Sequence, residues 1–368
     1  MKGWIQKTWG EIATLEYGKA LRGYQNANGT VRVFGTNGPV GWHNIPQSEG
    51  PGVIIGRKGA YRGVHYTEHP FWVIDTAYYL SPKTTIDLKW CYYSLKNTDI
   101  NTLQSGSAVP STSRADFYAT PALIPPKHEQ QAIATALSAL DDKIAANERI
   151  SESTEELCRH LVEASATATP RVSVDSLCNL SKAQATPSSL THPFIKHYSL
   201  PAFDKGKLPE TDQPTTIKSN KFIINSPSVL ISKLNPNTPR VWNIPKVDGT
   251  PCLASTEFLV LEPSEGVSTH ELWAVLSQPG FTDRLASRVT GTSKSHQRVR
   301  PAEIMSAKVV DPRALGPICE QITGLASKSV AAIEESRTLA ELRDTLLPQL
   351  MSGKLRVKDA ERIVEDNA

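Results

Sequence analysis

The sequence is poor in cysteine and has no long hydrophobic run. Its five cysteines are widely spaced and form no Cys-x-x-Cys pair: Cys91, Cys158, Cys178, Cys252 and Cys319. This odd, scattered set argues against a disulfide framework or a structural zinc site and is typical of reduced thiols in the cytosol. No segment approaches the roughly 20 apolar residues of a membrane helix, and the first residues lack the apolar core of a signal peptide. We therefore expect a cytoplasmic protein with no membrane contact.

Motifs for catalysis are also missing. The Gly353-Lys354 pair lacks the upstream glycine of a phosphate-binding loop, because Pro348 stands in its place. The chain has no Asn-Pro-Pro-Tyr or Asp-Pro-Pro-Tyr segment of the kind that an amino-methyltransferase offers to a flipped base. His65 and His69 have the spacing of metal ligands on a helix, but their segment has the pattern of a strand end before a turn. The sequence therefore predicts neither an enzyme nor a metal site.

What the chain does contain is an internal repeat. A Glu-Gln pair ends each copy, at Glu129-Gln130 and at Glu320-Gln321. Three earlier segments recur in the same order: 53–57 (VIIGR) as 229–233 (VLISK), 75–78 (DTAY) as 255–258 (STEF), and 104–109 (QSGSAV) as 289–294 (VTGTSK). The offset between the copies grows along the chain, as loop insertions in the second copy would produce. Two copies predict two similar lobes that meet a partner twice.

The charge distribution follows this repeat. We assign residues 1–126 and 164–312 to a first and a second lobe, with 12 Lys+Arg against 8 Asp+Glu and 16 against 12. The central stretch 127–163 carries 4 against 8, and the C-terminal stretch 313–368 carries 8 against 9. Basic lobes joined by acidic or neutral connectors favour a polyanion that binds to the lobes. Scatter in surface composition is the alternative.

Two long helices are predicted in these connectors. The first follows Pro125-Pro126 and runs to about residue 163 without Pro or Gly, a span of roughly 55 Å at 1.5 Å per residue. The second is expected to end at Pro348 and Gly353, with a tail beyond. Narrow apolar stripes are typical of helices that pack along each other, here in an antiparallel pair. Two unrelated helices, each covering its own lobe, are the alternative. The stripe residues are Ile133, Leu137, Leu140, Ile144, Leu157, Leu161, Ile318, Ile322, Leu325, Ile333, Leu342 and Leu346.

The lobes themselves have a strand-rich pattern. Short apolar or aromatic runs are separated by clusters of Gly, Pro, Asn and Ser, and a short helix is expected after each last strand. We therefore predict an α+β protein. Its two pseudo-repeated lobes contain twisted, mostly antiparallel sheets and are joined by two long antiparallel helices. Residues 164–170 are small and polar and are interpreted as a linker.

Three segments resemble the specificity subunits of type I restriction–modification systems. Residues 125–148 resemble the central region of that family, and residues 346–357 (LLPQLMSGKLRV) resemble the end of its second helix. Residues 54–63 (IIGRKGAYRG) are similar to a loop that is common in its target-recognition domains. The similarity covers nearly the whole chain in the family's order of lobe, helix, lobe, helix. Residues 311–321 depart from the pattern by extra residues before the second Glu-Gln, which leaves the start of the second helix undefined.

The resemblance implies a non-catalytic subunit that gives DNA specificity to a methyltransferase and endonuclease complex. Each lobe would read one half of a bipartite, asymmetric target in double-stranded DNA, and the helices would set the spacer. Two modification (methyltransferase) subunits would dock alongside, and whether restriction (nuclease and translocase) subunits join stays open. No cofactor is expected on this chain, because S-adenosylmethionine, Mg²⁺ and ATP would bind the partner subunits. The alternative is a two-lobed scaffold or adaptor that binds something other than DNA and dimerises through its helices.

Candidate DNA-contacting residues follow from charge and loop chemistry. The turn 56–63 places three cations and a tyrosine among glycines, where backbone amides and guanidinium groups can approach phosphate or guanine edges. A solvated hairpin is the alternative for this turn. The matching turn of the second lobe and the two segments before the long helices supply further cations. The full set is Lys19, Arg22, Arg57, Lys58, Tyr61, Arg62, Arg114, Lys233, Arg240, Lys294, Arg298 and Arg300. Because the loops differ, we expect the lobes to read different half-sites.

Overall fold

The computed structural model describes residues 3–26, 28–103, 110–287 and 297–367. The chain forms two compact units, the first from Met1–Lys143 with Leu339–Ala368 and the second from Ile144–Thr338. Each unit therefore holds one lobe and part of both long helices. Among the described residues no helix has the length and apolarity needed to cross a bilayer.

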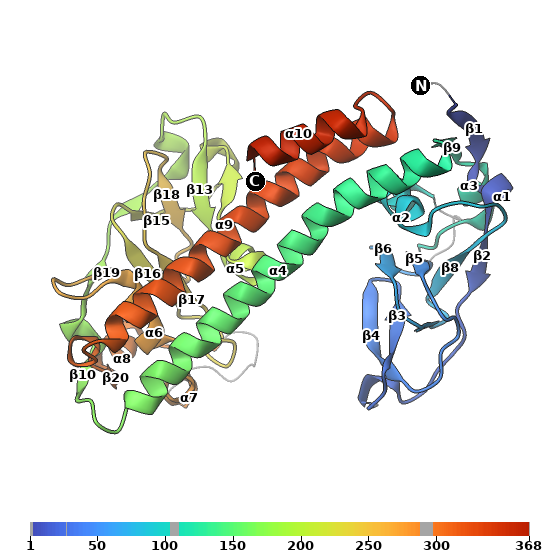
Figure 1. The fold of residues 1–368 in the computed structure, drawn as a ribbon. Helices are drawn as coiled ribbons and strands as arrows, with labels where there is room; N and C mark the ends of the chain where they lie inside the picture. The colour runs from blue at the N-terminus through green and yellow to red at the C-terminus, as the bar shows by residue number, and fades with distance from the viewer. Residues whose placement is uncertain (1–2, 27, 104–109, 288–296, 368) are drawn as a thin grey trace. The chain divides into compact units, whose positions relative to one another are not determined.

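Two sheets form the first lobe (Figure 1). The larger has the order β2-β8-β5-β6, with β2 (Ala13–Tyr17), β8 (Ala77–Pro82), β5 (Gly52–Gly56) and β6 (Val64–Thr67). The smaller has the order β4-β3-β7, with β4 (Gly38–His43), β3 (Val31–Gly35) and β7 (Phe71–Val73). A separate antiparallel pair joins β1 (Ile5–Thr8) to β9 (Pro121–Ile124). Among the described strands of the first lobe, β3 and β7 are the one parallel pair.

Three short helices complete the first lobe, namely α1 (Trp9–Ile12), α2 (Leu88–Lys96) and α3 (Arg114–Ala119). Helix α2 begins where the Asp87 side chain accepts a hydrogen bond from the Trp90 amide, and Ser113 caps α3 in the same way. The three helices meet through aromatic rings, because Trp9 lies 6.4 Å from Trp90 and 5.7 Å from Phe117 between centroids. All three rings are buried, so this cluster fixes the helices to one another.

The second lobe repeats this arrangement with additions. Its larger sheet has the order β11-β19-β16-β17, with β11 (Cys178–Ser181), β19 (Phe258–Pro263), β16 (Ser228–Ser232) and β17 (Val241–Ile244). The other has the order β12-β15-β18-β13-β14, with β12 (Gln184–Ala185), β15 (Lys221–Ile224), β18 (Cys252–Ala254), β13 (Ile195–Tyr198) and β14 (Glu210–Asp212). The outer pair joins β10 (Arg171–Ser173) to β20 (Lys308–Val310).

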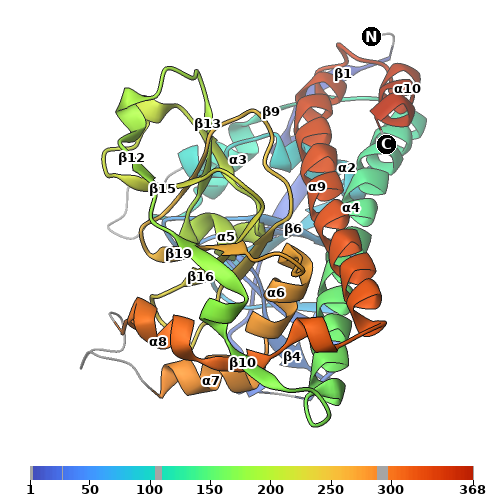
Figure 2. The same cartoon turned by 90° about the vertical axis from the view of Figure 1, so that its left-hand side faces the viewer.

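Four helices belong to the second lobe, and their bounds are α5 (Leu200–Gly206), α6 (Thr269–Leu276), α7 (Pro279–Ala286) and α8 (Pro301–Ser306). Helix α6 is fixed at its start by a capping box between Ser268 and Glu271. It packs on β16 and β17 and reaches the second long helix through a 3.1 Å hydrogen bond between His270 and Ser327 (Figure 2).

The strand registers confirm that the two lobes are copies of one topology. Gly56 faces Ala77 at the end of β5, and Ser232 faces Phe258 at the end of β16. Ala77 therefore corresponds to Phe258, one residue later than the sequence parallel between 75–78 and 255–258 indicates. In both lobes one buried cluster lies between the two sheets, with Ile54 and Phe34 in the first and their counterparts Leu230 and Tyr198 in the second. The repeat expected from short sequence matches is thus present in the backbone pairing.

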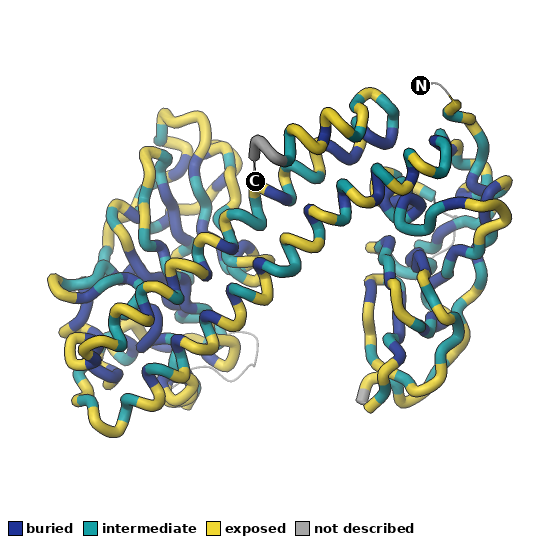
Figure 3. Tube along the Cα trace, viewed as in Figure 1, coloured by how far each residue is buried: buried dark blue, intermediate teal, exposed yellow. Residues whose placement is uncertain are grey.

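The long helices are α4 (Lys127–Ser165) and α9 (Ile318–Met351). In the second unit Ser151 contacts Ser329 at 2.9 Å, and in the first unit Arg343 bonds Asp141 at 2.6 Å. Within the second unit Asn147, Ser151 and Cys158 of α4 contact Glu335, Ser329 and Ile322 of α9 in turn, which confirms the antiparallel pair (Figure 3 shows the buried positions along both helices).

The structure also defines the end points that the sequence left open. Helix α9 begins at Ile318, after a 3-10 turn at Pro312–Ala314 that accounts for the extra residues. Pro348 was expected to mark the end of the helix but lies inside it, and the chain leaves the helix near Gly353, whose φ is 67°. A proline costs only one backbone bond so near a helix end, so the helix tolerates it there. The tail forms a further helix, α10 (Val357–Asn367).

Candidate nucleic-acid interface

The cation-rich turn of the first lobe, residues 57–62, is held rigidly by backbone bonds. The Gly56 amide donates to Gly63 across the turn at 2.8 Å. The segment before α3 clamps the turn from the side, because Thr112 donates its amide to Arg57 and its hydroxyl to Gly56, each at 2.8 Å. Gly59 has a φ of +120°, which a residue with a side chain rarely adopts. The strand β5 and the start of α3 therefore position this turn jointly.

Two predicted cations, Arg57 and Arg114, meet on one tyrosine. The guanidinium carbons of Arg57 and Arg114 lie 4.9 Å and 5.0 Å from the ring centroid of Tyr17. Arg57 also lies 5.7 Å from the Tyr78 ring, and Arg114 donates to the Tyr118 hydroxyl at 2.8 Å. We call these five residues the Tyr17 cluster. It joins the end of β2, the turn after β5, strand β8 and helix α3 into one surface.

Electrostatics keep the Tyr17 cluster charged. Hydrogen bonds to Tyr118 and Tyr17 raise the pKa of Arg114 above its usual value. A hydrogen bond from Arg114 lowers the pKa of the Tyr17 hydroxyl. Tyr17 is 47 % exposed, so a ligand can reach the ring and the two guanidinium groups. Paired guanidinium groups on an aromatic platform can bind phosphate oxygens or the edge of a guanine.

The other predicted cations of this lobe surround the turn. Lys58 lies 3.4 Å from Asp75, and both side chains are about half exposed. Tyr61 at the tip is 81 % exposed. Lys19 and Arg22 follow β2 as exposed residues, and the Lys19 amide is anchored to the Val73 carbonyl at 2.8 Å. These side chains are placed where a polyanion bound at the Tyr17 cluster could also meet them.

Arg62 is the exception, because it points into the lobe and is only 4 % exposed. Its guanidinium group donates to the carbonyls of Asn101 at 2.8 Å, Gly59 at 3.2 Å and Ile100 at 3.4 Å. A buried cation needs such partners, because it has lost its contact with water. The structure therefore corrects the expectation of a surface contact, since Arg62 fastens the turn to the segment at 100–101.

In the second lobe two of the predicted cations, Lys233 and Arg298, contact one glutamate, Glu257. The Lys233 amide bonds the Glu257 carbonyl at 2.8 Å, and Arg298 forms two bonds to the Glu257 carboxylate at 2.7 Å and 3.1 Å. The hydrogen bond from Arg298 lowers the pKa of Glu257. Burial lowers the pKa of Lys233, and the charge of Arg298 adds to this effect while Glu257 opposes it. Glu257 thus bonds Arg298 through its carboxylate and Lys233 through its backbone carbonyl.

The remaining predicted residues of the second lobe are dispersed. Arg240 forms a bidentate pair with Asp204 at 2.6 Å and 2.8 Å, and this pair lowers the pKa of Asp204. Arg300 is exposed at the residue that precedes α8. Lys294 lies outside the described residues, as do the repeated segments 104–109 and 289–294. The structure therefore brings Lys233 and Arg298 together around Glu257 and leaves Arg240 with a different acid.

One side-chain group has ligand atoms spaced as for a metal ion. His197, Glu210 and Asp212 place their ligand atoms within 4.8 Å of one another on the paired strands β13 and β14. His197 Nδ1 already lies 2.9 Å from an Asp212 oxygen, so a His–carboxylate hydrogen bond accounts for the arrangement. The first-lobe pair His65 and His69 lies on and after strand β6 instead of on a helix. Burial lowers the pKa of His65.

The predicted stripe residues of the long helices occupy several environments. Five are buried, namely Ile133, Leu137, Leu140, Ile322 and Leu346. Six are half-buried, namely Ile144, Leu161, Ile318, Leu325, Ile333 and Leu342. Leu157 is 47 % exposed, and its neighbour Cys158 is fully buried instead. The helix turns 100° per residue, so a polar series at Asn147, Ser151 and Thr154 leads to Cys158 and not to Leu157.

Polar side chains therefore form much of the seam in the second unit. Asn147 donates to Glu335 at 2.7 Å and is 2 % exposed. Its partner and the Ser151–Ser329 contact satisfy polar groups that would otherwise be buried without hydrogen bonds. Such contacts fix the register of paired helices, because a shifted register would leave these groups unsatisfied. Asn147 and Thr154 interrupt the apolar pattern of α4, and both are buried.

Several functional residues escaped prediction from the sequence. Tyr17, Tyr78 and Tyr118 belong to the Tyr17 cluster but lie on three different elements. The one available signal was the position of Tyr17 at the end of a strand, two residues before Lys19. Glu257 escaped prediction because an acidic residue is not expected at a surface that is predicted to bind a polyanion. Its position beside a repeated strand could have indicated it.

Comparisons with known proteins agree with this architecture. Residues 1–156 match the type I restriction modification DNA specificity domain. No curated protein matches the chain. The type I restriction–modification system S subunit from M. genitalium is similar in structure, with a TM-score of 0.63 and 17 % identity over 95 % of this chain and 96 % of that chain. The HsdS subunit from Thermoanaerobacter tengcongensis shares 15 % identity over 96 % and 98 % of the two chains, with a TM-score of 0.33. The first of these structures shows the same fold.

Proposed function

We propose that this chain is a specificity subunit of a type I restriction–modification system, because its residues 1–156 match the DNA specificity domain of that family, and that its Tyr17 cluster contacts double-stranded DNA. The observation that carries the proposal is the convergence of Arg57 and Arg114 on the half-exposed ring of Tyr17. Two fixed guanidinium groups supply bidentate donors, and the ring holds them apart without neutralising them. Lys58, Lys19 and Arg22 would add phosphate contacts around it.

We further propose that the two lobes read different half-sites. The backbone places Arg57 and Lys233 at equivalent positions, directly after the central strands β5 and β16. A guanidinium group offers a planar fork for a guanine edge, whereas a lysine offers one rotatable donor. Glu257 in the second lobe can also accept a hydrogen bond from the amino group of cytosine. An asymmetric bipartite target follows from these differences.

The long helices would set the spacer between the two half-sites that the lobes read. The bonds of Asn147 to Glu335 and of Arg343 to Asp141 each allow one register of α4 against α9. A fixed register would give a fixed spacer between the half-sites. Inserting seven residues near Ala145 adds about 10 Å while roughly keeping the facing of the helix. We expect the spacer to lengthen by one or two base pairs, because the other helix is unchanged and duplex DNA rises about 3.4 Å per pair. An unchanged spacer in a folded, active insertion variant would rule this role out.

The partners and cofactors complete the proposal. Two modification subunits would bind this chain, and restriction subunits would join in a complete system. S-adenosylmethionine, Mg²⁺ and ATP would be bound by those subunits, while this chain would supply recognition without catalysis. Light scattering of the reconstituted complex should give two modification subunits per chain, and a stable one-to-one complex without a second site would contradict this stoichiometry.

Gel shifts with randomised duplex DNA test the central proposal. Selection should enrich a bipartite sequence, and affinity for random DNA should fall steeply between two salt concentrations, by about 0.9 in log–log slope for each neutralised phosphate. An adaptor that uses its lobes for another partner predicts neither enrichment nor slope. Arg57→Ala should then weaken binding of the selected sequence, with Lys205→Ala, an exposed residue of α5 outside the site, as the matched control.

A further inference from the structure

Three side chains of the second lobe that can bind a metal ion lie on one face of the paired strands β13 and β14. His197 faces Glu210 across this pair, and Ile195 faces Asp212. Opposed residues share a face of the sheet, as do residues two apart along a strand. His197, Glu210 and Asp212 therefore lie on the same side, and one ligand atom of each lies within 4.8 Å of the others. We call these three residues the His197 group.

The imidazole of His197 presents one nitrogen to the acids. Its Nδ1 lies 2.9 Å from a carboxylate oxygen of Asp212, whereas its Nε2 is buried without a hydrogen-bond partner among the described residues. The His197 side chain is only 15 % exposed, so its neighbours restrict the ring. The Ser199 hydroxyl donates to the Glu210 carboxylate at 3.4 Å. Contacts within the fold thus position the ligand atoms of the His197 group.

The His197 group also lacks a cation that would balance its charge. In the part of the chain that the structure describes, neither Glu210 nor Asp212 forms an ion pair with a lysine or an arginine. The neighbouring Lys196 lies on the other face of β13 and bonds Asp248 at 2.6 Å. With the imidazole neutral, as metal binding requires, the group carries about two negative charges. A divalent cation would balance them.

The first lobe has a histidine but neither acid at the equivalent positions. In its matching strands, β3 and β4, Val33 faces Gly41 and Val31 faces His43. The parallel pairings establish the equivalence, because β7 lies beside β3 as β18 lies beside β13. This sheet therefore forms with a valine and a glycine where the second lobe has His197 and an acid. Strand pairing alone does not require the His197 group.

We propose that the His197 group binds a divalent first-row transition-metal ion, with Zn²⁺ as the ion for the test. One imidazole nitrogen and two carboxylate oxygens are ligands that zinc accepts at about 2.0–2.2 Å, and water completes four-coordination. Such ligand atoms are roughly 3.3 Å apart, so the group has to contract slightly, which the exposed Glu210 side chain permits. On binding, Nδ1 of His197 exchanges its hydrogen bond to Asp212 for a bond to the ion, and the neutral ring carries its proton on Nε2.

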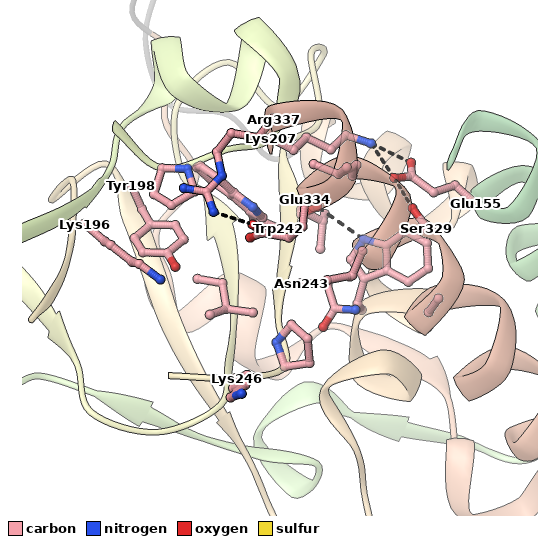
Figure 4. Close-up of a pocket in the computed structure, with 18 of the residues that line it drawn as sticks. Glu155, Lys196, Tyr198, Lys207, Trp242, Asn243, Lys246, Ser329, Glu334 and Arg337 are labelled. Atoms are coloured by element: carbon pink, nitrogen blue, oxygen red, sulfur yellow. Dashed lines mark hydrogen bonds and ion pairs between the residues drawn. The ribbon is translucent and has the colours of Figure 1, made fainter. Parts of the chain in front are cut away.

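The ion would join the two strands that flank helix α5. Strand β14 is the outer strand of its sheet and pairs with β13. Helix α5 and the residue after it are already linked to the rest of the second unit at two places. Asp204 bonds Arg240 at 2.6 Å, and Lys207 bonds Glu155 of α4 at 2.6 Å (Figure 4). A bound ion would add a third link and reduce local opening of residues 195–212.

Isothermal titration calorimetry of the full chain with Zn²⁺ tests the site, after a chelator has been added and removed. The parent should bind one Zn²⁺ at the His197 group. Glu210→Gln keeps the size of an exposed side chain and removes its charge, so it should weaken Zn²⁺ binding by about tenfold or more. Asp212→Asn keeps an acceptor for the His197 ring and should have a similar effect. If the parent binds no Zn²⁺, or both variants bind it as the parent does, the proposal is overturned.

His160 provides the matched control, because it also lies beside two acids. Its two nitrogens face different partners on α4, Glu156 at 3.7 Å and Glu163 at 3.6 Å, and all three side chains are exposed. These atoms do not converge on one point, so His160→Ala should leave the affinity and the stoichiometry of Zn²⁺ binding unchanged. Loss of the bound Zn²⁺ in His160→Ala, with the parent's affinity retained in Glu210→Gln, would overturn the proposal.

Hydrogen exchange locates the ion without relying on a substitution. Saturating Zn²⁺ should slow exchange in peptides that cover residues 195–212 and leave peptides that cover residues 31–43 of the first lobe unchanged. Mg²⁺ at the same concentration should slow neither, because it prefers six oxygen ligands. Zinc binding is measured on the chain alone, so its outcome is independent of the proposed DNA binding. Equal protection of both segments by Zn²⁺, or of neither, would show that the ion does not bind at the His197 group.

Discussion

The two lobes share a backbone and differ in what holds their cations. In the first lobe Arg57 and Arg114 lie on the ring of Tyr17, so their charges stay available to a ligand. In the second lobe Arg298 lies on the carboxylate of Glu257, with the Lys233 amide bonded to the same residue. An aromatic ring attracts a cation without cancelling its charge, whereas a carboxylate cancels it. The two lobes therefore offer surfaces of different net charge from the same strands.

This comparison separates the framework from the reading surface. The framework consists of buried strands such as β5 and β16, in which every residue is buried. The proposed reading surface consists of the residues directly after them, such as Arg57 and Lys233, whose amides still bond the neighbouring strand segment. A substitution of these side chains should change recognition without disturbing the sheet. Duplication of such a unit yields two readers that can diverge independently.

The largest expected effect is on stability, at the turn formed by residues 57–62 of the first lobe. Arg62→Met removes the guanidinium donors that bind the carbonyls of Gly59, Ile100 and Asn101. We expect the free energy of unfolding to fall by about 2–4 kcal/mol, because several buried hydrogen bonds are lost together. Urea denaturation of the full chain measures this change.

The matched variant in the second lobe is Arg298→Met. The Arg298 side chain is 53 % exposed, so its ion pair with Glu257 should contribute less than about 1 kcal/mol to stability. Hydrogen exchange should localise the Arg62→Met effect to peptides that cover residues 52–67 and 100–103. Equal destabilisation by both variants would mean that Arg62 is no more structural than Arg298.

The second prediction compares the two equivalent cations in DNA binding. Arg57→Ala should cost about 1–3 kcal/mol on the selected target if the side chain reads a guanine. Lys233→Ala should cost less, about 1 kcal/mol, because a single rotatable donor discriminates less than a guanidinium fork. Fluorescence anisotropy on target and random duplexes measures both. If Arg57→Ala weakens both duplexes equally, Arg57 contacts phosphate, and if it weakens neither, this turn is not part of the interface.

The third prediction concerns a variant that removes the negative charge of Glu257, so that the cations of the second lobe become as available as those of the first. Glu257→Gln keeps a hydrogen-bond acceptor for Arg298 but removes the negative charge. Affinity for random duplex DNA should rise by about threefold at low salt, with a steeper salt dependence, because one more cation meets the phosphates. The same change in charge at Glu262, a half-buried residue of β19, is the control. A loss of binding would show instead that the Glu257 carboxylate itself contacts DNA.

The pH dependence of stability gives this pair a second test. Arg298 lowers the pKa of Glu257 in the folded state. The pair therefore stabilises the fold at pH values above the unfolded pKa of a glutamate, and this contribution is lost as pH falls through the lowered folded pKa. Glu257→Gln should remove that part of the acid dependence of unfolding. An identical pH profile for the variant and the parent would mean that the pair contributes nothing to stability.

The sequence predicted the framework better than the reading surface. Short matches such as 53–57 with 229–233 located the buried strands, because apolar runs have few alternatives to burial. Helix α4 begins at Lys127 as expected after Pro125-Pro126, and it ends at Ser165, close to the predicted end. The antiparallel packing of α4 and α9 was also correct. These features depend on local pattern, which a sequence displays directly.

The features that escaped prediction depend on tertiary contacts. Arg62 and Arg57 belong to one turn and have the same chemistry, yet one is buried and the other lies on Tyr17. Nothing in the local sequence distinguishes them, because two of the three carbonyls that accept from Arg62 belong to the distant residues 100–101. The polar seam at Asn147 and Ser151 was missed for a similar reason. The hydrogen-bond partners of these residues lie on α9, and the second lobe separates α9 from α4 in the sequence.

The smallest expected effect concerns the ring that separates the two guanidinium groups. Tyr17→Phe keeps the ring under Arg57 and Arg114 and removes the hydroxyl, so DNA affinity near neutral pH should fall by less than about threefold. Tyr17→Ala removes the ring and should cost about tenfold, since each exposed cation–ring contact contributes about 0.5–1 kcal/mol. At alkaline pH Tyr17→Phe should instead bind DNA more tightly than the parent. Arg114 lowers the pKa of Tyr17, so the parent forms a phenolate that competes with phosphate for the arginines, whereas Tyr17→Phe cannot. Anisotropy titrations across neutral and alkaline pH measure the crossover, and parallel pH profiles for the parent and Tyr17→Phe would show that the tyrosine is not part of the DNA-binding surface.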